Sequence, residues 1–248
     1  MTLDYAHRRL RLQDAHSFET TLTGVAVNLA SKQPYIETTL TTQDGRRIAA
    51  SLEVDTGKLD PLSLTAAFAR QHGLLGDTRA LLPLKGVSLG GETQAWLTRA
   101  GALEFAGTTV KTPLLGIAED AANRDGQLGY ETLRRFTITF DYAHEKLYFA
   151  PNAAFAEPFE FDHAGMIIGA APPDFRALTI FVVVADTPAA RMGLQSGDTI
   201  LSVDGRPATE FTVDDARRYF QHATGDVKLI IKRQNRDIAV SVSCHSLV

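Results

Sequence analysis

The chain has 248 residues, of which 44% are hydrophobic and 22% are charged, a composition typical of a globular protein and not of a disordered or fibrous one. This length allows one large domain or two small ones. The formal net charge of −4 gives no general attraction to nucleic acid or to acidic membranes. Cys244 is the sole cysteine, which excludes an internal disulfide and a cysteine-built metal site.

The start of the chain and its apolar runs bear on localisation. No run approaches the roughly 18 apolar residues of a membrane helix, so we expect no membrane span. Met1 is followed directly by Thr-Leu-Asp-Tyr, without the apolar core of a signal peptide. We therefore expect a cytoplasmic protein or a piece of a longer gene product, which would reach the periplasm or cell envelope if that gene encodes a signal peptide.

One segment of the sequence occurs twice. Residues 2–12 read Thr-Leu-Asp-Tyr-Ala-His-Arg-Arg-Leu-Arg-Leu, and residues 139–149 read Thr-Phe-Asp-Tyr-Ala-His-Glu-Lys-Leu-Tyr-Phe. Both read as strand, turn and strand, and a long match at a fixed offset indicates a repeated structural unit. The second copy closes a domain. We therefore expect residues 1–18 to be the closing hairpin of an earlier, similar lobe, in a larger two-lobed protein.

Between the two copies the pattern is mostly that of strands. Asp44-Gly45 is a typical hairpin turn, and the strand that returns from it ends at Asp55. Pro61-Leu62-Ser63 is expected to begin a helix that ends at Gly73. The expected strands of this region are residues 24–28, 35–40, 48–54, 102–105 and 109–117.

Two motifs in this region point to one family. Asp55-Thr56-Gly57 follows an apolar strand, and much later Leu128-Gly129 precedes a short helix and a closing hairpin. An Asp-x-Gly triplet alone is ordinary turn chemistry. With both motifs present in this order, residues 19–150 resemble the lobe of bacterial retropepsin-like aspartic peptidases. The resemblance implies a mainly β fold, an acid-protease β-barrel lobe in which Gly129 lets its strand pack beneath the Asp-Thr-Gly loop.

The resemblance also implies roles for individual residues. Asp55 would be the catalytic carboxylate, Thr56 the hydroxyl that braces two such loops against each other, and Gly57 the residue of close approach. Gly90-Gly91, a turn flanked by strands, would form the substrate flap, although any surface hairpin reads the same way. Lys58 departs from the small residue that is usual after the glycine, and an ammonium there would oppose proton sharing by two carboxylates. Gln127 departs from the usual apolar residue.

Aspartic peptidases use two carboxylates that share a proton, and neither a metal nor a covalent intermediate takes part. This chain has a single Asp-Thr-Gly and therefore supplies half of the pair. The partner would come from a second copy of the chain or from the preceding lobe. We expect no cofactor and no metal, because the seven histidines show no His-Glu-x-x-His or similar spacing.

The rest of the chain indicates a second domain. Residues 151–159 contain proline and alanine and are expected to be a linker. Beyond them, the run from Asp186 to Pro207 has a short helix at 188–192, a Gly-Asp turn, an Ile-Leu-x-Val strand and an Asp-Gly turn. It resembles the PDZ domain, which implies a β-sandwich with two short helices over residues 160–248. A second helix is expected at 213–223.

In a PDZ domain an extended peptide adds as a strand to a sheet edge, and its terminal carboxylate meets backbone N–H groups. Gly165 would shape the carboxylate loop, and Met166, Ile167 and Ile168 would form the edge strand. Facing residues recur at helical spacing, although each could equally be core. They are Val213, Ala216, Arg217 and Phe220.

These features predict an aspartic endopeptidase that acts on peptide or protein substrates, assisted by a peptide-binding PDZ domain. The alternative is a catalytically degenerate lobe in a peptide-binding scaffold protein. We expect neither nucleic acid nor a membrane among the partners.

Overall fold

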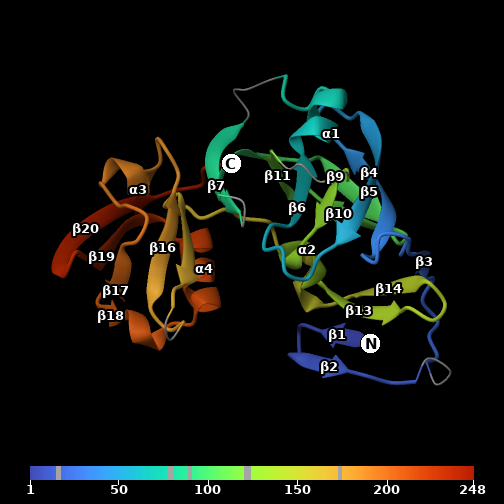
Figure 1. Ribbon diagram of the computed structural model, residues 1–248. Coiled ribbons are helices and arrows are strands. Elements are labelled where there is room, and N and C mark those ends of the chain that lie inside the picture. The colour runs from blue at the N-terminus through green and yellow to red at the C-terminus, as the bar shows by residue number, and fades with distance from the viewer. Residues whose placement is uncertain (15–17, 77–80, 89–90, 120–123, 173–174) are drawn as a thin grey trace. The chain divides into compact units, whose positions relative to one another are not determined.

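The computed structural model describes residues 1–14, 18–76, 81–88, 91–119, 124–172 and 175–248 (Figure 1). The chain divides into two compact units, one made of Met1–Leu82 with Ala95–Phe159 and the other of Pro83–Gln94 with Glu160–Val248. Strands dominate both units, so the predicted mainly β fold is confirmed. Among the described residues, no helix is long and apolar enough to cross a membrane.

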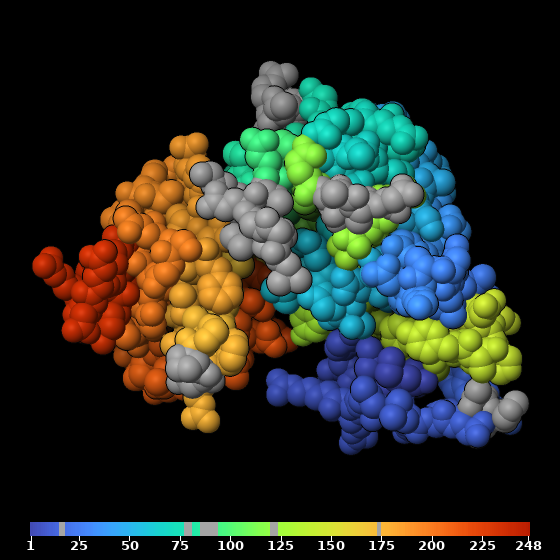
Figure 2. Space-filling model, in the orientation of Figure 1, coloured from blue at the N-terminus to red at the C-terminus, as the bar shows by residue number. Residues whose placement is uncertain are grey.

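The first unit contains a five-stranded sheet that joins the two copies of the repeated segment. Its order is β2-β1-β13-β14-β3, and both copies form hairpins (Figure 1). In the space-filling view the dark-blue N-terminal hairpin lies against the yellow-green segment of the second copy (Figure 2). The strands are β1 (Thr2–Asp4), β2 (Arg9–Arg11), β3 (Val25–Ala26), β13 (Phe136–Asp141) and β14 (Lys146–Pro151).

A larger sheet carries the Asp-Thr-Gly loop. Its order is β10-β9-β4-β5-β12-β6-β11-β8-β7. The strands are β4 (Tyr35–Thr41), β5 (Arg47–Val54), β6 (Leu62–Thr65), β7 (Leu82–Ser88), β8 (Gly91–Arg99), β9 (Ala102–Phe105), β10 (Thr108–Lys111), β11 (Leu114–Ala118) and β12 (Gly126–Leu128). As expected, β4 and β5 form a hairpin closed at Asp44-Gly45, where Gly45 has φ +85° and donates to the Thr42 carbonyl at 3.1 Å. Buried and exposed positions alternate along β4, as in a half-buried strand.

The expected helix from Pro61 to Gly73 is wrong in its first half. Leu62–Thr65 forms β6, which lies between β12 and β11 and is buried at every position. Helix α1 (Ala66–Gln71) begins only after Thr65, whose side-chain oxygen accepts from the Phe68 N–H at 3.2 Å. Pro61 locally favours the start of a helix, but β6 pairs with a strand on each side. This pairing outweighs the local preference.

The single strand expected at 109–117 is also wrong, because it is two strands, β10 and β11. Thr112 has φ +45°, a conformation that interrupts a strand, and Pro113 has no N–H to donate to a ladder. The chain turns at this point and re-enters the same sheet at a distant position in the strand order. There β11 pairs in parallel with β6.

The segment after β14 is tied to the first unit. It contains the short 3-10 helix η3 (Ala153–Ala156) and follows helix α2 (Tyr130–Leu133) and strands β13 and β14. Arg135 is fully buried, and its guanidinium donates to the carbonyls of Ala154, Glu157 and Pro158. It also lies 3.6 Å from the ring centroid of Phe159. We therefore propose that the boundary between the domains falls after Phe159, at the end of the expected linker.

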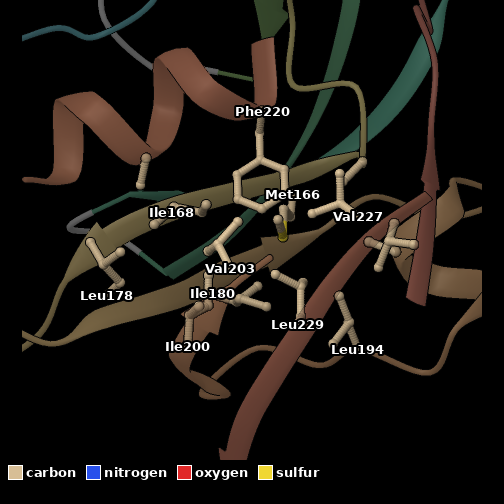
Figure 3. Packing of buried hydrophobic residues seen from close by; sticks show 14 of the residues in the cluster. Met166, Ile168, Leu178, Ile180, Leu194, Ile200, Val203, Phe220, Val227 and Leu229 are labelled. Carbon is tan, nitrogen blue, oxygen red and sulfur yellow. The ribbon is translucent and has the colours of Figure 1, made fainter. Parts of the chain in front are cut away.

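The C-terminal sheet has the order β15-β16-β17-β19-β20, and β18 pairs with β17. Helix α4 begins at a capping box in which Thr212 and Asp215 exchange hydrogen bonds, and its Phe220 points into the core beside Met166 and Ile168 (Figure 3). The strands are β15 (Met166–Ala170), β16 (Leu178–Val183), β17 (Thr199–Val203), β18 (Arg206–Pro207), β19 (Gly225–Arg233) and β20 (Arg236–Cys244). The helices are α3 (Pro188–Arg191), η4 (Ala208–Glu210) and α4 (Val213–His222).

A buried carboxylate organises the loop before β15. Asp162 is 8% exposed, and its Oδ1 accepts from the backbone N–H groups of Ala164, Gly165 and Met166 at 2.9, 2.8 and 3.2 Å. Burial raises the pKa of Asp162 from 3.8 to about 7, while the three N–H donors and the neighbouring His163 act in the opposite direction.

We predict that Gly129→Ala destabilises the first unit. A Cβ at Gly129 would lie 2.1 Å from the Asp60 carbonyl oxygen and 2.8 Å from that of Lys58, and both are backbone atoms that cannot move aside cheaply. We expect the free energy of unfolding, measured by urea denaturation, to fall by about 1–3 kcal/mol. Gly76→Ala is the matched control, because its added Cβ would meet nothing closer than 3.6 Å. Equal stability of the two variants would contradict this packing.

We predict that Asp162 makes the second unit less stable as pH rises from about 4 to about 7. Its pKa is higher in the folded chain than the ordinary 3.8, so in this window the folded state holds a proton that the unfolded state has released. Stability from this group is complete below pH 4 and is lost as pH passes 7. Thermal unfolding of wild type and Asp162→Asn across pH 4–8 measures it. The unfolding temperature should fall less steeply with rising pH in the variant than in the wild type. Identical slopes of unfolding temperature against pH would contradict the prediction.

Candidate functional site

Asp55 is positioned by an inserted strand. Strand β12 lies between β5 and β6, parallel to the first and antiparallel to the second, with Leu128 opposite Val54. The Asp55 N–H donates to the Leu128 carbonyl at 3.0 Å, which extends the ladder by one residue beyond the end of β5. Asp55 is half-buried, while Thr56 and Gly57 are exposed at the tip of the loop. The two motifs found in the sequence are thus brought together.

Both oxygens of the Asp55 carboxylate have partners within the same lobe. Oδ1 accepts from the Gly57 N–H at 2.8 Å, and a Cβ at residue 57 would lie 3.3 Å from this oxygen. Oδ2 accepts from Gln127 Nε2 at 2.7 Å. A carboxylate that accepts hydrogen bonds at both oxygens is held in one orientation.

Gln127 belongs to a buried polar cluster that the sequence did not reveal. It lies opposite Glu53 in the β12–β5 pairing, and its Nε2 also donates to Glu53 Oε2 at 3.2 Å. Arg124 Nη1 donates to the same Glu53 oxygen at 2.8 Å. Glu53 and Gln127 are 6% and 9% exposed, so the cluster is a desolvated ion pair with an amide bridge to Asp55. The available signals in the sequence were the acidic Glu53 inside an apolar strand and the polar Gln127 directly before Leu128-Gly129.

The loop that follows Asp55 rests on Gly129. The Tyr130 N–H donates to the Lys58 carbonyl at 2.7 Å, and the Gly129 N–H donates to the Pro61 carbonyl at 3.1 Å. The expected packing of Gly129 beneath the loop is therefore present. The Lys58 ammonium lies 3.2 Å from Asp60 Oδ2, so this cation has a carboxylate partner of its own outside the Asp-Thr-Gly triplet.

The expected flap at Gly90-Gly91 falls partly outside the described residues. Gly90 lies outside the described residues, and Gly91 begins β8. Strand β8 pairs with β11, with Trp96 opposite Ile117. The flap assignment stays a prediction.

The two copies of the repeated segment have the same local structure. Equivalent positions are paired within each hairpin, for example Leu3 with Leu10 and Phe140 with Leu147. Both turns are closed by the same contact, a histidine Nδ1 that lies 2.8 Å from an aspartate Oδ2 (His7 with Asp4, His144 with Asp141). The two segments are therefore alike in structure as well as in amino-acid sequence.

The two hairpins are related by a local twofold axis. Thr2 lies opposite Thr139, its own counterpart in the repeat, and their hydroxyl oxygens are 2.9 Å apart. Beside them, Met1 and Phe140 exchange backbone hydrogen bonds of 3.0 and 2.8 Å. Antiparallel pairing of equivalent positions is self-complementary in the same way as an isologous interface.

The second candidate site is the β15 edge. Among the described strands, β15 pairs only with β16, which leaves its other edge without a strand partner. Gly165 has φ +83°, and a Cβ there would lie 2.3 Å from Thr187, so this position requires glycine. Arg217 Nε donates to the Ile168 carbonyl at 2.8 Å. Of the residues expected to contact a peptide, Met166, Ile168, Ala216 and Phe220 are buried in the core, while Ile167 and Val213 are half-buried.

In the part of the chain that the structure describes, no group of three or more His, Cys, Asp or Glu side chains could hold a metal ion. The Asp55 cluster contains carboxylates, an amide and a guanidinium, and the β15 edge presents backbone groups.

Comparison with known proteins identifies one of these two parts. Residues 179–233 match the family model of the PDZ domain, which confirms the predicted PDZ domain in this region and assigns peptide binding to it as a class of function. No curated protein matches the chain.

Three similar solved structures are each at most 20% identical to this chain. A retropepsin-like aspartic protease from Rickettsia conorii is 20% identical, covers 52% of this chain and 89% of its own, and gives a TM-score of 0.40. A serine endoprotease from Yersinia pestis is 17% identical, with coverage of 94% and 91% and a TM-score of 0.36. The photosystem II D1 C-terminal processing protease is 16% identical over 35% of this chain, with a TM-score of 0.33, and this chain spans 23% of its length.

Proposed function

We propose that residues 19–150 form one half of an aspartic endopeptidase and that the PDZ domain holds peptide segments of its substrates. The observation that carries the proposal is the Asp55 carboxylate, fixed at the end of β5 by the Gly57 N–H at 2.8 Å and by Gln127 at 2.7 Å. Its loop rests on Gly129, where a larger residue would collide with the backbone.

The chemistry needs a second carboxylate facing Asp55. Two carboxylates about 3 Å apart cannot both ionise comfortably, so one stays protonated and polarises the substrate carbonyl while the other activates a water. Asp55 supplies one of these groups. In this proposal the exposed Thr56 and Gly57 lie where the loop of the second half would meet this one, with the Thr56 hydroxyl as the brace between loops.

The twofold axis between the hairpins supports a second lobe as the source of the partner. Residues 2–12 end one such lobe in the way that residues 139–149 end this one, because the two hairpins share pairing and turn contacts. A lobe attached ahead of Thr2 would be related to the present lobe by the axis that passes between Thr2 and Thr139. Two Asp-Thr-Gly loops in one polypeptide would then be related by symmetry.

Lys58 does not oppose this proposal. Its ammonium lies 3.2 Å from Asp60, so that pair carries no net charge toward the carboxylates. The departure from a small residue after the glycine is therefore compatible with proton sharing.

A second candidate function has one observation in its favour. Gln127 already occupies Asp55 Oδ2, which reduces the hydrogen-bonding capacity left for a water or a partner carboxylate. In that case the lobe is a catalytically degenerate part of a peptide-binding scaffold protein. Activity measurements separate the two candidates.

We predict little or no casein cleavage by this chain alone. Cleavage should appear in a tandem polypeptide in which a second copy of residues 19–138 is joined directly ahead of Thr2, so that the copy runs into its own closing hairpin. Activity should be highest at acidic pH, where one proton stays on the pair. Asp55→Asn in either copy should abolish it, measured as the release of fluorescent fragments from labelled casein between pH 4 and 8.

Asp44→Asn is the matched control, since it removes an exposed acidic charge of the same unit far along the β4–β5 hairpin from Asp55. Full cleavage by a tandem polypeptide with Asp55→Asn in both copies would eliminate the aspartic mechanism. No cleavage by any form would favour the scaffold function. Full cleavage by the single chain, rising with the square of its concentration, would favour a homodimer.

A further inference from the structure

The backbone donors that a PDZ domain offers to a peptide terminus are already used in this chain. In such domains the terminal carboxylate of a ligand lies in a nest of backbone N–H groups ahead of the edge strand. Here that position corresponds to the N–H groups of Ala164, Gly165 and Met166, which lead into β15. All three point at one atom, Oδ1 of Asp162, at 2.9, 2.8 and 3.2 Å.

We propose that Asp162 is the built-in carboxyl group of this nest, and that the PDZ domain therefore takes peptides as internal, extended segments without requiring a free C-terminus. The inference rests on the peptide-binding part of the proposed function and is independent of the peptidase part. Asp162 is the specificity-determining residue, since it decides whether a terminal carboxylate finds the three N–H donors free or already occupied.

The chain holds Asp162 firmly in this position. The Asp162 backbone carbonyl also accepts from the Gly165 N–H at 3.1 Å, which closes the turn that the side chain fills. Gly165 lies against Thr187, whose hydroxyl donates to the Val184 carbonyl at 2.7 Å. The turn is further anchored at Ala164, whose carbonyl accepts from the Ala189 N–H at 2.8 Å. A carboxylate buried to this degree has no solvated position to move to without opening the turn.

A peptide terminus would lose on two counts at this nest. Its carboxylate would find the three donors already bound, and an unpartnered buried charge is costly. It would also lie beside the Asp162 carboxyl, which favours protonation of one of the two groups. A neutral segment that passes the nest without ending there avoids both costs.

The edge of β15 is left for such a segment. The Ile168 carbonyl, on β15, accepts from the Arg217 Nε of helix α4 at 2.8 Å, so a donor from outside the β15–β16 pair already reaches this strand. Arg217 also lies 3.9 Å from Asp214, an exposed residue of the same helix, which gives its guanidinium an alternative partner. A peptide N–H can replace Arg217 at this carbonyl, and the main chain of an extended segment supplies the remaining ladder bonds.

The test compares two pools of fluorescein-labelled decapeptides with randomised last four positions, one with free C-terminal carboxylates and one with C-terminal amides. The full chain carries Asp55→Asn throughout, so that cleavage cannot alter the peptides. Fluorescence polarisation should give apparent affinities for the two pools that agree within twofold. Asp162→Ala should favour the free-acid pool by tenfold or more, because its three N–H groups are released.

Asp162→Asn is the conservative variant, since its amide oxygen still accepts from the same three N–H groups and should keep the two affinities within twofold. Asp226→Ala, which removes an exposed charge of the same unit, controls for net charge. If the chain with native Asp162 bound the free-acid pool tenfold more tightly than the amide pool, that result alone would overturn the proposal. The proposal would also be overturned if a folded Asp162→Ala protein had the same ratio of affinities for the two pools as the chain with native Asp162.

Amide hydrogen exchange separates this proposal from peptide binding itself. The amides of Ala164, Gly165 and Met166 should exchange slowly in the chain with native Asp162 and at least tenfold faster in Asp162→Ala. Slow exchange without binding of either pool would refute the peptide-binding function while the nest stands as described. Fast exchange with native Asp162 in place would refute the occupied nest whatever the peptides do.

Discussion

The insertion of β12 between β5 and β6 is the contact on which the rest of the first unit depends. It joins residues that lie more than sixty positions apart in the chain, Leu128 with Val54 on one side and with Leu62 on the other. Two glycines make this possible, because a Cβ at Gly126 would lie 2.1 Å from the Ser63 carbonyl oxygen and a Cβ at Gly129 equally close to that of Asp60. Without this insertion Asp55 would lie at the end of an ordinary hairpin.

The same insertion places polar groups where the lobe can use them. Gln127 faces Glu53 and Asp55 because parallel pairing puts its side chain on their side of the sheet. Arg124 neutralises Glu53, so the carboxylate beside Asp55 is not an uncompensated charge. Asp55 is thus oriented by contacts within its own lobe, and the proposed acid–base function would require such an arrangement.

Much of the fold could be predicted from local signals in the sequence. The end of the strand at Asp55, the turn at Asp44-Gly45 and the PDZ run from Asp186 depend on short stretches whose local structure can be read from the residues themselves. The strand β6 and the break at Thr112 were not predictable, because long-range pairing decided the first and a left-handed backbone the second.

The polar partners of the two sites were hidden for a related reason. Glu53 and Gln127 are neighbours only once β12 has paired with β5. Asp162 lies just ahead of the segment read as a peptide site, but its sequence neighbours do not say that its side chain would fold back onto three backbone donors. Side-chain to backbone contacts of this kind are set by turn geometry, which the residue types alone leave open.

The most direct measurement is a crystal structure of the tandem polypeptide with its two Asp-Thr-Gly lobes. We predict that the two Asp55 carboxylates lie about 3 Å apart across the axis between Thr2 and Thr139, close enough to share one proton. Each should keep its contacts to Gly57 and Gln127. Lobes in which the two carboxylates do not face each other, with each Asp55 bound only by its own loop, would contradict the claim that this lobe is half of an active site.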